Sequence, residues 1–156
     1  MINLRKARVS DVENIHALIN KYAEKGLMLA RSRSLLYECL REFVVAEEDN
    51  VFLGTGGLHI IWEDLAEIRA LAIVEEAKGK GIGRAIVGKL IEEARYLGIP
   101  RVFVLTYQKI FFAKCGFSEI PKEELSTKVW KECINCPKFP KCDEIAFIIE
   151  TNKRLN

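Results

Sequence analysis

The stretch KGKGIGR, residues 78–84, brings three glycines and three cations together directly before a run with helical spacing. The first turn of a helix exposes backbone N–H groups and the positive end of the helix dipole, which together attract an anion. Glycines let the backbone approach that anion closely and adopt positive φ angles. We therefore expect a phosphate-binding loop, whose residues are Lys78, Gly79, Lys80, Gly81, Ile82, Gly83 and Arg84.

The spacing of the glycines separates several kinds of phosphate loop. A P-loop requires Lys followed by Ser or Thr after its last glycine, whereas Arg84 follows Gly83 here. A dinucleotide loop has the spacing G-x-G-x-x-G after a first strand, but these glycines recur at every second residue after a fourth predicted strand. Neither nucleotide loop fits. A glycine-rich turn with solvated lysines remains as the alternative that binds nothing.

Together with the elements around it, the loop resembles the acetyl-CoA motif of the GNAT acetyltransferase superfamily, Arg/Gln-x-x-G-x-Gly/Ala. In that superfamily the motif follows the fourth strand and opens the third helix, and here Lys78 stands in place of Arg or Gln. FFAKCGF, residues 111–117, is similar to the closing Y-x-K-x-G-F element of the superfamily. The resemblance implies a mixed α/β GNAT fold, with a mostly antiparallel twisted sheet of roughly six to seven strands and about four flanking helices.

The same resemblance implies acetyl-CoA as the co-substrate. Its pantetheine arm would lie along the edge of the strand that contains Leu71, Ala72 and Ile73. The backbone N–H groups of these residues would also face the thioester oxygen, on which negative charge develops during acyl transfer.

Two further runs are similar to the short, single-domain bacterial N-acetylglutamate synthases: WEDLAEIR at residues 62–69 and VLTYQKIFFAKCGF at residues 104–117. That resemblance implies direct transfer of the acetyl group of acetyl-CoA to the α-amine of L-glutamate, the first step of arginine biosynthesis. The longer relatives carry an amino-acid-kinase-like domain, for which 156 residues leave no room. An acetyltransferase for another small amine or a protein N-terminus, and a non-catalytic CoA-binding regulator, remain as alternatives.

Acetyl transfer to an amine needs a proton acceptor, because a free α-amine has a pKa of about 8 and is largely protonated at neutral pH. The resemblance places this base at Glu67, which would otherwise be a solvent-facing strand carboxylate. Many acetyltransferases have a tyrosine that acts as the general acid where Phe112 stands here, so we expect Tyr107 to protonate the leaving thiolate instead if its side chain points inward. A surface or core tyrosine without a catalytic role is the alternative. The thiolate could also leave without a protein acid, since a thiol has a pKa of about 8.5.

Glutamate carries two carboxylates, which arginine binds best because its guanidinium can make two parallel hydrogen bonds. Arg31 lies between the first two predicted helices, where the superfamily binds its acceptor, and the neighbouring Ser32 could add a hydrogen bond. Arg69 stands two residues after Glu67, so both side chains share one face of the strand. We expect Arg31, Ser32 and Arg69 to bind the acceptor, with Arg69 alternatively the ion partner of Glu67.

Three cysteines, Cys133, Cys136 and Cys142, lie close together in the segment CINCPKFPKC. The C-x-x-C half has the spacing of a zinc site, but a structural zinc takes four ligands. We expect no metal in the active site. For these cysteines a structural metal, a redox-sensitive or disulfide pair, and reduced thiols all remain open.

The composition and the net charge bear on the class of partner. The 156 residues are 49% apolar and carry a formal net charge of +2, which does not favour nucleic acid or an anionic membrane as partner. The N-terminus is charged from Arg5 and no apolar run reaches about 18 residues, so we expect a cytoplasmic protein. We expect one GNAT domain over residues 1–156, with a cysteine-containing connection at 121–142, and a homodimer is compatible with the sequence.

Hydrophobic periodicity predicts the elements that would position these residues. Ser10 and Glu13 form a capping box that predicts the start of the first helix, and Asp49-Asn50 predicts a hairpin turn. The first expected helix starts at Ser10, and the other three span residues 32–41, 81–99 and 108–115. The expected strands are 2–9, 43–49, 51–62, 66–74, 101–106, 116–120 and 143–151.

Overall fold

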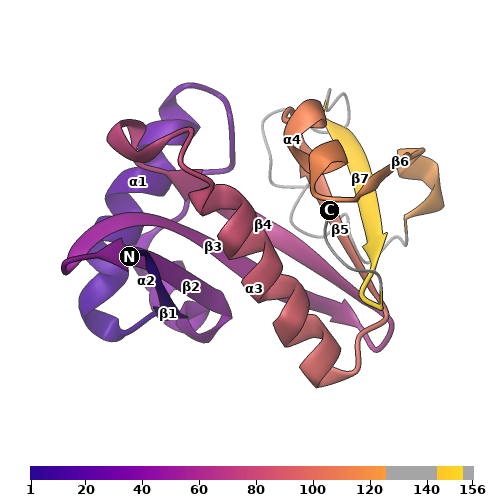
Figure 1. Cartoon of the computed structure of the whole chain (residues 1–156), viewed down its shortest axis with the longest axis horizontal. Helices are drawn as coiled ribbons and strands as arrows, with labels where there is room; N and C mark the ends of the chain where they lie inside the picture. The colour runs from indigo at the N-terminus through magenta and orange to yellow at the C-terminus, as the bar shows by residue number, and fades with distance from the viewer. Residues whose placement is uncertain (126–143, 153–156) are drawn as a thin grey trace. The chain divides into compact units, whose positions relative to one another are not determined.

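The computed structural model of the chain describes residues 1–125 and 144–152. Within these residues, seven strands form one mixed sheet in the order β1-β2-β3-β4-β5-β7-β6, accompanied by four α-helices (Figure 1). The element order and the mixed sheet confirm the predicted fold class. The chain divides into two compact units, residues 1–59 with 68–90 and residues 60–67 with 91–156, and each is described by itself.

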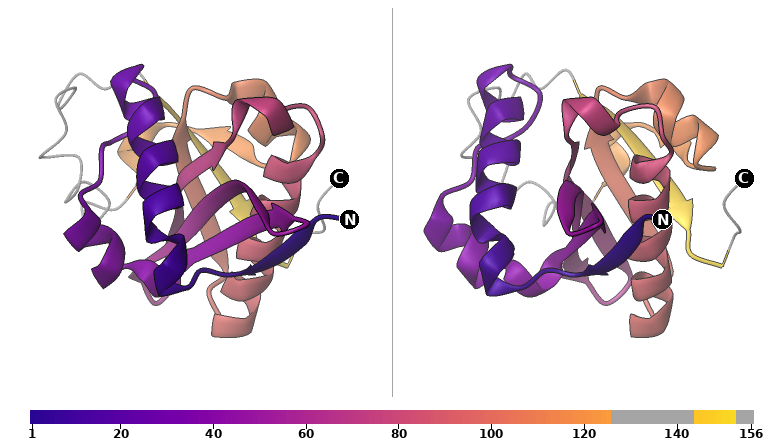
Figure 2. Two further views of the ribbon diagram at one scale, coloured as in Figure 1. Left: turned by 90° about the vertical axis from the view of Figure 1, so that its left-hand side faces the viewer. Right: turned by 60° about the vertical axis from the view of Figure 1, so that its left-hand side comes forward.

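The first unit is a sheet with helices on both faces. Strands β1 and β2, and strands β2 and β3, pair antiparallel. Helices α1 and α2 lie over one face of these strands, and the beginning of α3 lies over the other (Figure 2). The unit contains β1 (Asn3–Lys6), α1 (Val12–Glu24), α2 (Arg33–Glu38), β2 (Phe43–Glu48) and parts of β3 (Val51–Trp62), β4 (Leu65–Ile73) and α3 (Ile82–Leu97).

The start of α1 shows that the predicted capping box of Ser10 and Glu13 is wrong. A short 3-10 turn precedes the helix, and the carboxylate of Asp11 accepts a hydrogen bond from the backbone N–H of Arg8 at 2.7 Å. Glu13 binds the Nε of Arg33 at 2.8 Å instead. Asp11 therefore fixes the entry into the helix.

An ion network explains why Asp11 takes this position. Two nitrogens of Arg5 on β1 lie 2.7 and 2.9 Å from the two carboxylate oxygens of Asp11, and the Arg5 Nε lies 2.8 Å from Glu47 on β2. The hydrogen bonds from Arg5 hold the pKa of Asp11 and that of Glu47 below their usual values. A paired carboxylate can be buried here, whereas the Ser10 hydroxyl has no such cation to bind.

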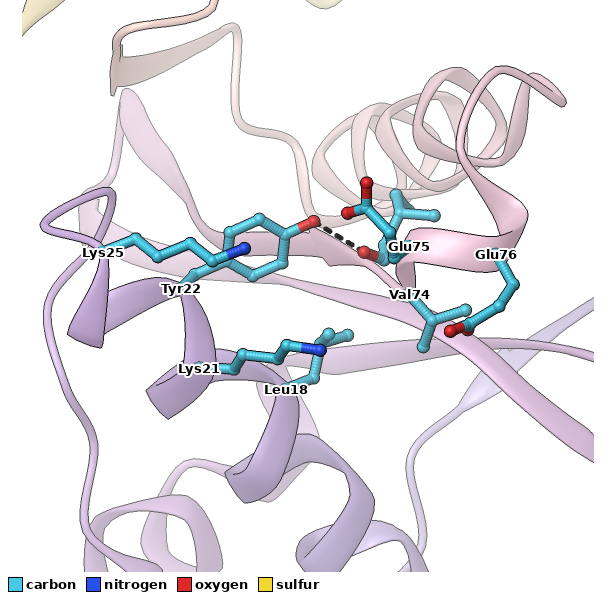
Figure 3. Close-up of a pocket in the computed structure, with 8 residues that line it drawn as sticks. Leu18, Lys21, Tyr22, Lys25, Val74, Glu75 and Glu76 are labelled. Atoms are coloured by element: carbon cyan, nitrogen blue, oxygen red, sulfur yellow. Dashed lines mark hydrogen bonds between the residues drawn. The ribbon is translucent and has the colours of Figure 1, made fainter.

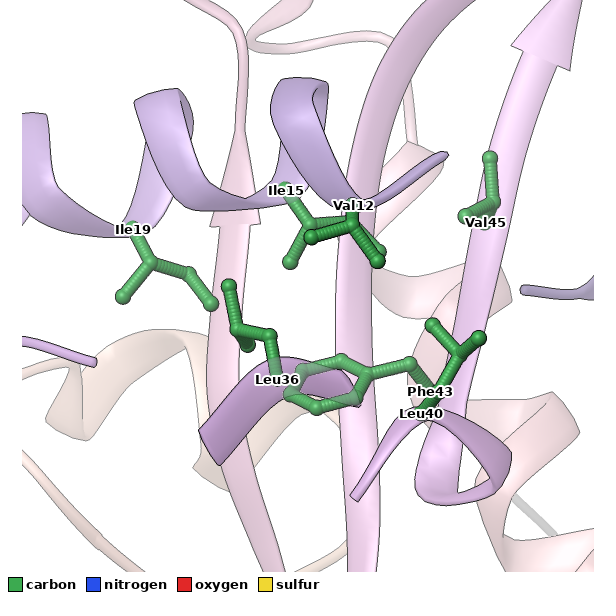
Figure 4. Close-up of a cluster of buried hydrophobic side chains, with 7 residues drawn as sticks. All are labelled: Val12, Ile15, Ile19, Leu36, Leu40, Phe43 and Val45. Carbon is green, nitrogen blue, oxygen red and sulfur yellow. The ribbon is translucent and has the colours of Figure 1, made fainter. Parts of the chain in front are cut away.

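One apolar cluster of the first unit lies between the two N-terminal helices and the sheet (Figure 4). The apolar face of α1 meets side chains from α2 and β2 there, and all of them are buried. This burial provides the main stabilisation of a helix pair that would not be stable alone in water. The cluster consists of Val12, Ile15, Ile19, Leu36, Leu40, Phe43 and Val45.

The hairpin between β2 and β3 confirms the predicted turn. Asp49 and Asn50 have φ angles of 51° and 65°, the left-handed conformation that a two-residue hairpin turn requires. Glu48 pairs with Val51 across the turn, and the register shifts between Ala46 and Glu47. The shift places Leu53 of β3 as an extra residue between two paired positions, as in a β-bulge.

Two glycines of β3 allow the end of β4 and the start of α3 to lie close to this strand. A Cβ on Gly56 would lie 2.9 Å from the Ile86 Cγ2 of α3 and 3.2 Å from the Leu71 Cδ1 of β4. A Cβ on Gly54 would lie 2.7 Å from the Ile73 Cδ1. Strand β3 therefore packs closely against both ends of the loop that joins β4 to α3.

The second unit contains the C-terminal strands. Strand β4 begins here and pairs parallel with β5 (Arg101–Thr106), while β7 (Ile145–Glu150) pairs antiparallel with both β5 and β6 (Ser118–Ile120). Helix α4 (Lys109–Lys114) connects β5 to β6. Leu65, Phe103, Leu125 and Ala146 form a buried cluster of this unit. No helix within the described residues combines the length and the apolar character needed to cross a membrane.

Candidate functional site

The glycine loop has the conformation that the sequence predicts. Gly79 and Gly81 have φ angles of 81° and 80°, which side chains with a Cβ rarely adopt. Ile82 is buried and anchors α3, whose first backbone bond runs from the Ala85 N–H to the Gly81 carbonyl at 3.1 Å. Lys80 is exposed beside the same turn. The loop thus presents a helix N-terminus to solvent, the arrangement that binds phosphate groups in other proteins.

The two cations that flank the loop differ in their surroundings. The Nζ of Lys78 lies 2.8 Å from the Oε2 of Glu75, and this hydrogen bond raises the pKa of Lys78 above its usual value. Arg84 is exposed on the first turn of α3. Gly83 lies between Ile82 and Arg84 and is half-buried. The role of the seven loop residues in phosphate binding stays a prediction.

The end of β4 is irregular just before the residues that we expect to bind pantetheine. Ala70 has a φ angle of 55°, which is unfavourable for a residue with a Cβ and tends to occur at functional positions. Leu71 and Ile73 follow, half-buried, with the buried Ala72 between them. A kink at Ala70 changes the direction in which the next N–H groups point, as an oxyanion site beside a strand requires.

Glu67 lies on β4 in the second unit. It is only 8% exposed, and it stands opposite Phe103 in the parallel pairing of β4 with β5. The alternative of a solvent-facing strand carboxylate therefore does not hold. Its role as a proton acceptor stays a prediction.

Tyr107 follows β5 directly and is half-buried. The turn after it is closed by the Thr106 hydroxyl, which accepts a hydrogen bond from the Gln108 N–H at 2.8 Å. Phe112, where the resemblance places a tyrosine that acts as the general acid, is buried and packs edge-on against Phe117 with ring centroids 5.2 Å apart. Phe112 is thus part of the core, and the assignment of Tyr107 as the acid stays a prediction.

Arg31 lies in the connection between α1 and α2 and is 8% exposed. The side-chain amide of Asn20 on α1 binds both the N–H and the carbonyl of Arg31. The Asn20 Nδ2 donates to the Arg31 carbonyl at 3.0 Å, and the Asn20 Oδ1 accepts from the Arg31 N–H at 3.1 Å. This pair of bonds fixes the point from which the guanidinium side chain extends.

Arg31 and Arg69 both act on the same thiol of the first unit. Burial raises the pKa of Cys39, the negative charge of Glu42 raises it further, and the positive charges of Arg31 and Arg69 oppose these effects. Glu42 in turn lies 2.9 Å from the Nδ1 of His59. Two of the predicted acceptor residues, Arg31 and Arg69, are thus cations whose charge acts on this half-buried thiol.

Ser32 has a structural task. It is the N-cap of α2, and its hydroxyl oxygen accepts a hydrogen bond from the Leu35 N–H at 3.1 Å. Its hydrogen remains available as a donor. A contact between Ser32 and an acceptor carboxylate stays a prediction.

Cys133, Cys136 and Cys142 lie outside the described residues. Of the two cysteines that the described ranges contain, Cys115 is buried and Cys39 is half-buried, and they are not joined in a disulfide. No group of three or more His, Cys, Asp and Glu side chains within these ranges could hold a metal ion.

Sequence reasoning missed two residues of α1, Asn20 and Tyr22. Asn is unfavourable in the middle of a helix unless its amide finds a specific partner, and this could have indicated a role for Asn20. Tyr22 continues the apolar spacing of α1, but its hydroxyl binds the Ile73 carbonyl at 2.6 Å. No pattern in the sequence indicates that contact.

The fold and the loop define an acetyltransferase. The model of the acetyltransferase (GNAT) family matches residues 12–117, so the chain belongs to this family. That residues 1–156 form a single domain of the family stays a prediction.

Similarity to named proteins narrows the class of acetyltransferase. An amino-acid acetyltransferase of Mycobacterium tuberculosis is 43% identical over 132 residues, which are 83% of this chain and 75% of the relative. A solved M. tuberculosis structure in complex with CoA and NLQ is 35% identical, covers 95% of this chain and 98% of its own, and has a TM-score of 0.82. The N-acetylglutamate synthase of Neisseria gonorrhoeae, complexed with coenzyme A and N-acetyl-glutamate, is 28% identical with a TM-score of 0.89 and covers 98% of this chain and 36% of its own.

Proposed function

We propose that the protein transfers the acetyl group of acetyl-CoA to the α-amine of L-glutamate. The observation that carries the proposal is the burial of Arg31 in the first unit, together with a second cation, Arg69, whose charge acts on the same half-buried thiol, Cys39. Two guanidinium groups suit an acceptor with two carboxylates. The neighbouring structure with N-acetyl-glutamate and the relatives named amino-acid acetyltransferase support the same acceptor.

The donor site that we propose consists of the glycine loop and the end of β4. The amides at the N-terminus of α3 would bind the pyrophosphate, with Lys80 and Arg84 adding positive charge. The edge of β4 from Leu71 to Ile73 would pair with the pantetheine amides. The structural neighbours that contain coenzyme A support this arrangement.

Glu67 would take a proton from the ammonium group of glutamate, directly or through water, and so free the amine to attack. Acetyl-CoA supplies the activated thioester carbonyl. The N–H groups that follow the kink at Ala70 would stabilise the negative charge that develops on its oxygen. Tyr107 would return a proton to the departing sulfur. The proposed mechanism uses no metal ion.

The test of the acceptor is a screen of amino acids with acetyl-CoA, in which release of the free CoA thiol is followed. We expect glutamate to exceed aspartate, glutamine and lysine by about tenfold or more, the effect of one well-matched charge pair. A flat profile across these amino acids contradicts glutamate as the acceptor. Binding of CoA without any thiol release would favour the non-catalytic regulator.

The test of the base is Glu67→Gln, which keeps the size of the side chain and removes its proton affinity. We expect kcat to fall by about 100-fold or more, as for the loss of a general base. The matched control is Glu63→Gln at the exposed end of the β3–β4 hairpin, where we expect unchanged kcat. Equal activity of the two variants would remove Glu67 from the mechanism.

A further inference from the structure

Tyr22 connects helix α1 to the end of β4 (Figure 3). The tyrosine lies near the C-terminus of α1, and its hydroxyl donates to the carbonyl of Ile73, the last residue of β4, at 2.6 Å. The side chain forms one wall of a pocket of about 120 Å³, which is lined by Leu18 and Lys21 of α1, by Lys25 directly after that helix and by residues 73–76. A bond of this length between elements 51 residues apart restrains their separation.

The geometry of one peptide unit shows which edge of β4 this bond occupies. The Val74 N–H donates to the Leu53 carbonyl of β3 at 2.9 Å, so it points toward β3. The Ile73 carbonyl belongs to the same planar trans peptide, in which C=O and N–H point in opposite directions. It therefore points away from β3, to the outer edge of β4. Tyr22 occupies an acceptor on that edge, which is the edge that pantetheine would pair with.

The ring of Tyr22 contacts the first residue of the glycine loop. The Lys78 Nζ lies 5.2 Å from the ring centroid, within the range of a cation–π contact, while Glu75 binds the same ammonium at 2.8 Å. One side chain thus contacts both ends of the segment from Ile73 to Lys78. That segment joins the strand edge to the phosphate loop.

We propose that Tyr22 is a positioning residue for the acetyl donor, an inference that rests on the proposed use of acetyl-CoA. Its hydroxyl occupies the Ile73 carbonyl, the last acceptor on the outer edge of β4. Pantetheine must therefore pair with the amide groups that precede this carbonyl. Its ring and the Glu75 carboxylate both contact the Lys78 ammonium, so they restrict this side chain and position the start of the loop. Helix α1 thereby fixes the distance between the strand edge and the phosphate loop.

The first test is Tyr22→Phe, which removes only the hydroxyl. We expect the KM for acetyl-CoA to rise about three- to tenfold, the effect of one hydrogen bond, with kcat within about twofold and the KM for glutamate unchanged. The matched control is Tyr96→Phe on α3, whose tyrosine is 89% exposed, and which should leave all three constants unchanged. A folded Tyr22→Phe variant with the parent KM for acetyl-CoA overturns the proposal.

A second comparison separates the hydroxyl from the ring. Tyr22→Leu removes both contacts, and S-acetylpantetheine is a donor that keeps the amides but has no pyrophosphate. We expect the loss caused by Tyr22→Phe to persist with S-acetylpantetheine, and the additional loss caused by Tyr22→Leu to occur only with acetyl-CoA. Equal losses of both variants with both donors would show a general loss of structure and overturn the positioning role.

Direct binding distinguishes this inference from the proposed function. If the parent binds CoA in calorimetry but transfers no acetyl group, the proposed function fails. Weaker CoA binding by Tyr22→Phe than by Tyr96→Phe would still support the positioning role in that case. Equal binding by these two variants would overturn it.

Discussion

The glycine loop, residues 78–84, and the arginine region around Arg31 are built in opposite ways. The loop is contiguous in sequence, largely exposed, and depends on the backbone conformation of Gly79 and Gly81. The arginine region is assembled from separate elements, and its central side chain, Arg31, is buried and held by Asn20. Under the proposed function, the loop binds the donor that all family members share, and the arginine region selects the acceptor.

The difference teaches where each site is sensitive to change. A backbone site tolerates most side-chain substitutions and fails when a required φ angle or its free N–H groups are lost. A side-chain site depends on one guanidinium and on the contacts that aim it. Substitutions in the two regions should therefore change the kinetic constants of different substrates.

The largest effect should come from Gly81→Glu in the loop. The new residue would have to adopt a φ angle of 80°, and its carboxylate would face the phosphates of the donor. A Cβ at this position would meet no other atom within 4 Å, so steric conflict within the protein is not the cause. We expect the affinity for acetyl-CoA to fall by about 100-fold or more, measured by calorimetry.

Gly98→Glu is the matched control for this variant. Gly98 has a φ angle of 81° and lies at the other end of α3, so the backbone cost and the added charge are the same. We expect lower thermal stability with unchanged affinity for acetyl-CoA. Similar losses of affinity in both variants would show that the loop has no special role.

The next effect should come from Arg31→Lys, which keeps the positive charge and removes the two-pronged hydrogen bonding. We expect the KM for glutamate to rise about 10- to 100-fold, with the KM for acetyl-CoA unchanged. Arg33→Lys is the control, because Arg33 is exposed and binds Glu13 at 2.8 Å. An unchanged KM for glutamate in Arg31→Lys would falsify the carboxylate role and return the choice of acceptor to another small amine.

A smaller effect should come from Asn20→Ala, which removes both hydrogen bonds to the backbone of Arg31. We expect the KM for glutamate to rise about three- to tenfold, because the guanidinium remains but its starting point is less fixed. The double variant with Arg31→Lys should lose less than the product of the single losses, since the two residues act on one interaction. Independent losses would contradict a link between Asn20 and Arg31.

The smallest effect should come from Lys80→Ala in the exposed part of the loop. We expect the KM for acetyl-CoA to rise about twofold at low salt and to return to the parent value at about 1 M salt, where exposed charges are screened. A large, salt-independent effect would show that a side chain rather than the backbone dominates phosphate binding. The comparison between the two regions would then no longer hold.

Much of the fold could be predicted from the sequence, because local patterns determine it. The turn at Asp49 and Asn50, the amphipathic α3 and the glycine loop each depend on residues close together in the chain. The start of α1 was predicted wrongly because the deciding partner of Asp11 is Arg5 on another element. A local capping box cannot compete with an ion pair that only the tertiary structure supplies.

The candidate site divides in the same way. Family resemblance predicts roles for the loop, Glu67 and Arg31 by position, but the burial of Glu67 and the two hydrogen bonds from Asn20 to the backbone of Arg31 could not be read from the sequence. Both depend on which side chains are adjacent after folding. Ser32 shows the converse, since its place before a helix made it a cap that local pattern alone could predict.

The sequence by itself determined the order of the elements, the positive φ angles of the glycine loop and the family to which the chain belongs. Hydrophobic spacing and glycine act over a few residues, so they need no information about distant parts of the chain. Only the tertiary structure decided that the charges of Arg31 and Arg69 act on the same thiol and that Tyr22 reaches the outer edge of β4. Contacts between residues far apart in sequence follow from packing of the whole core, and a local pattern does not encode them.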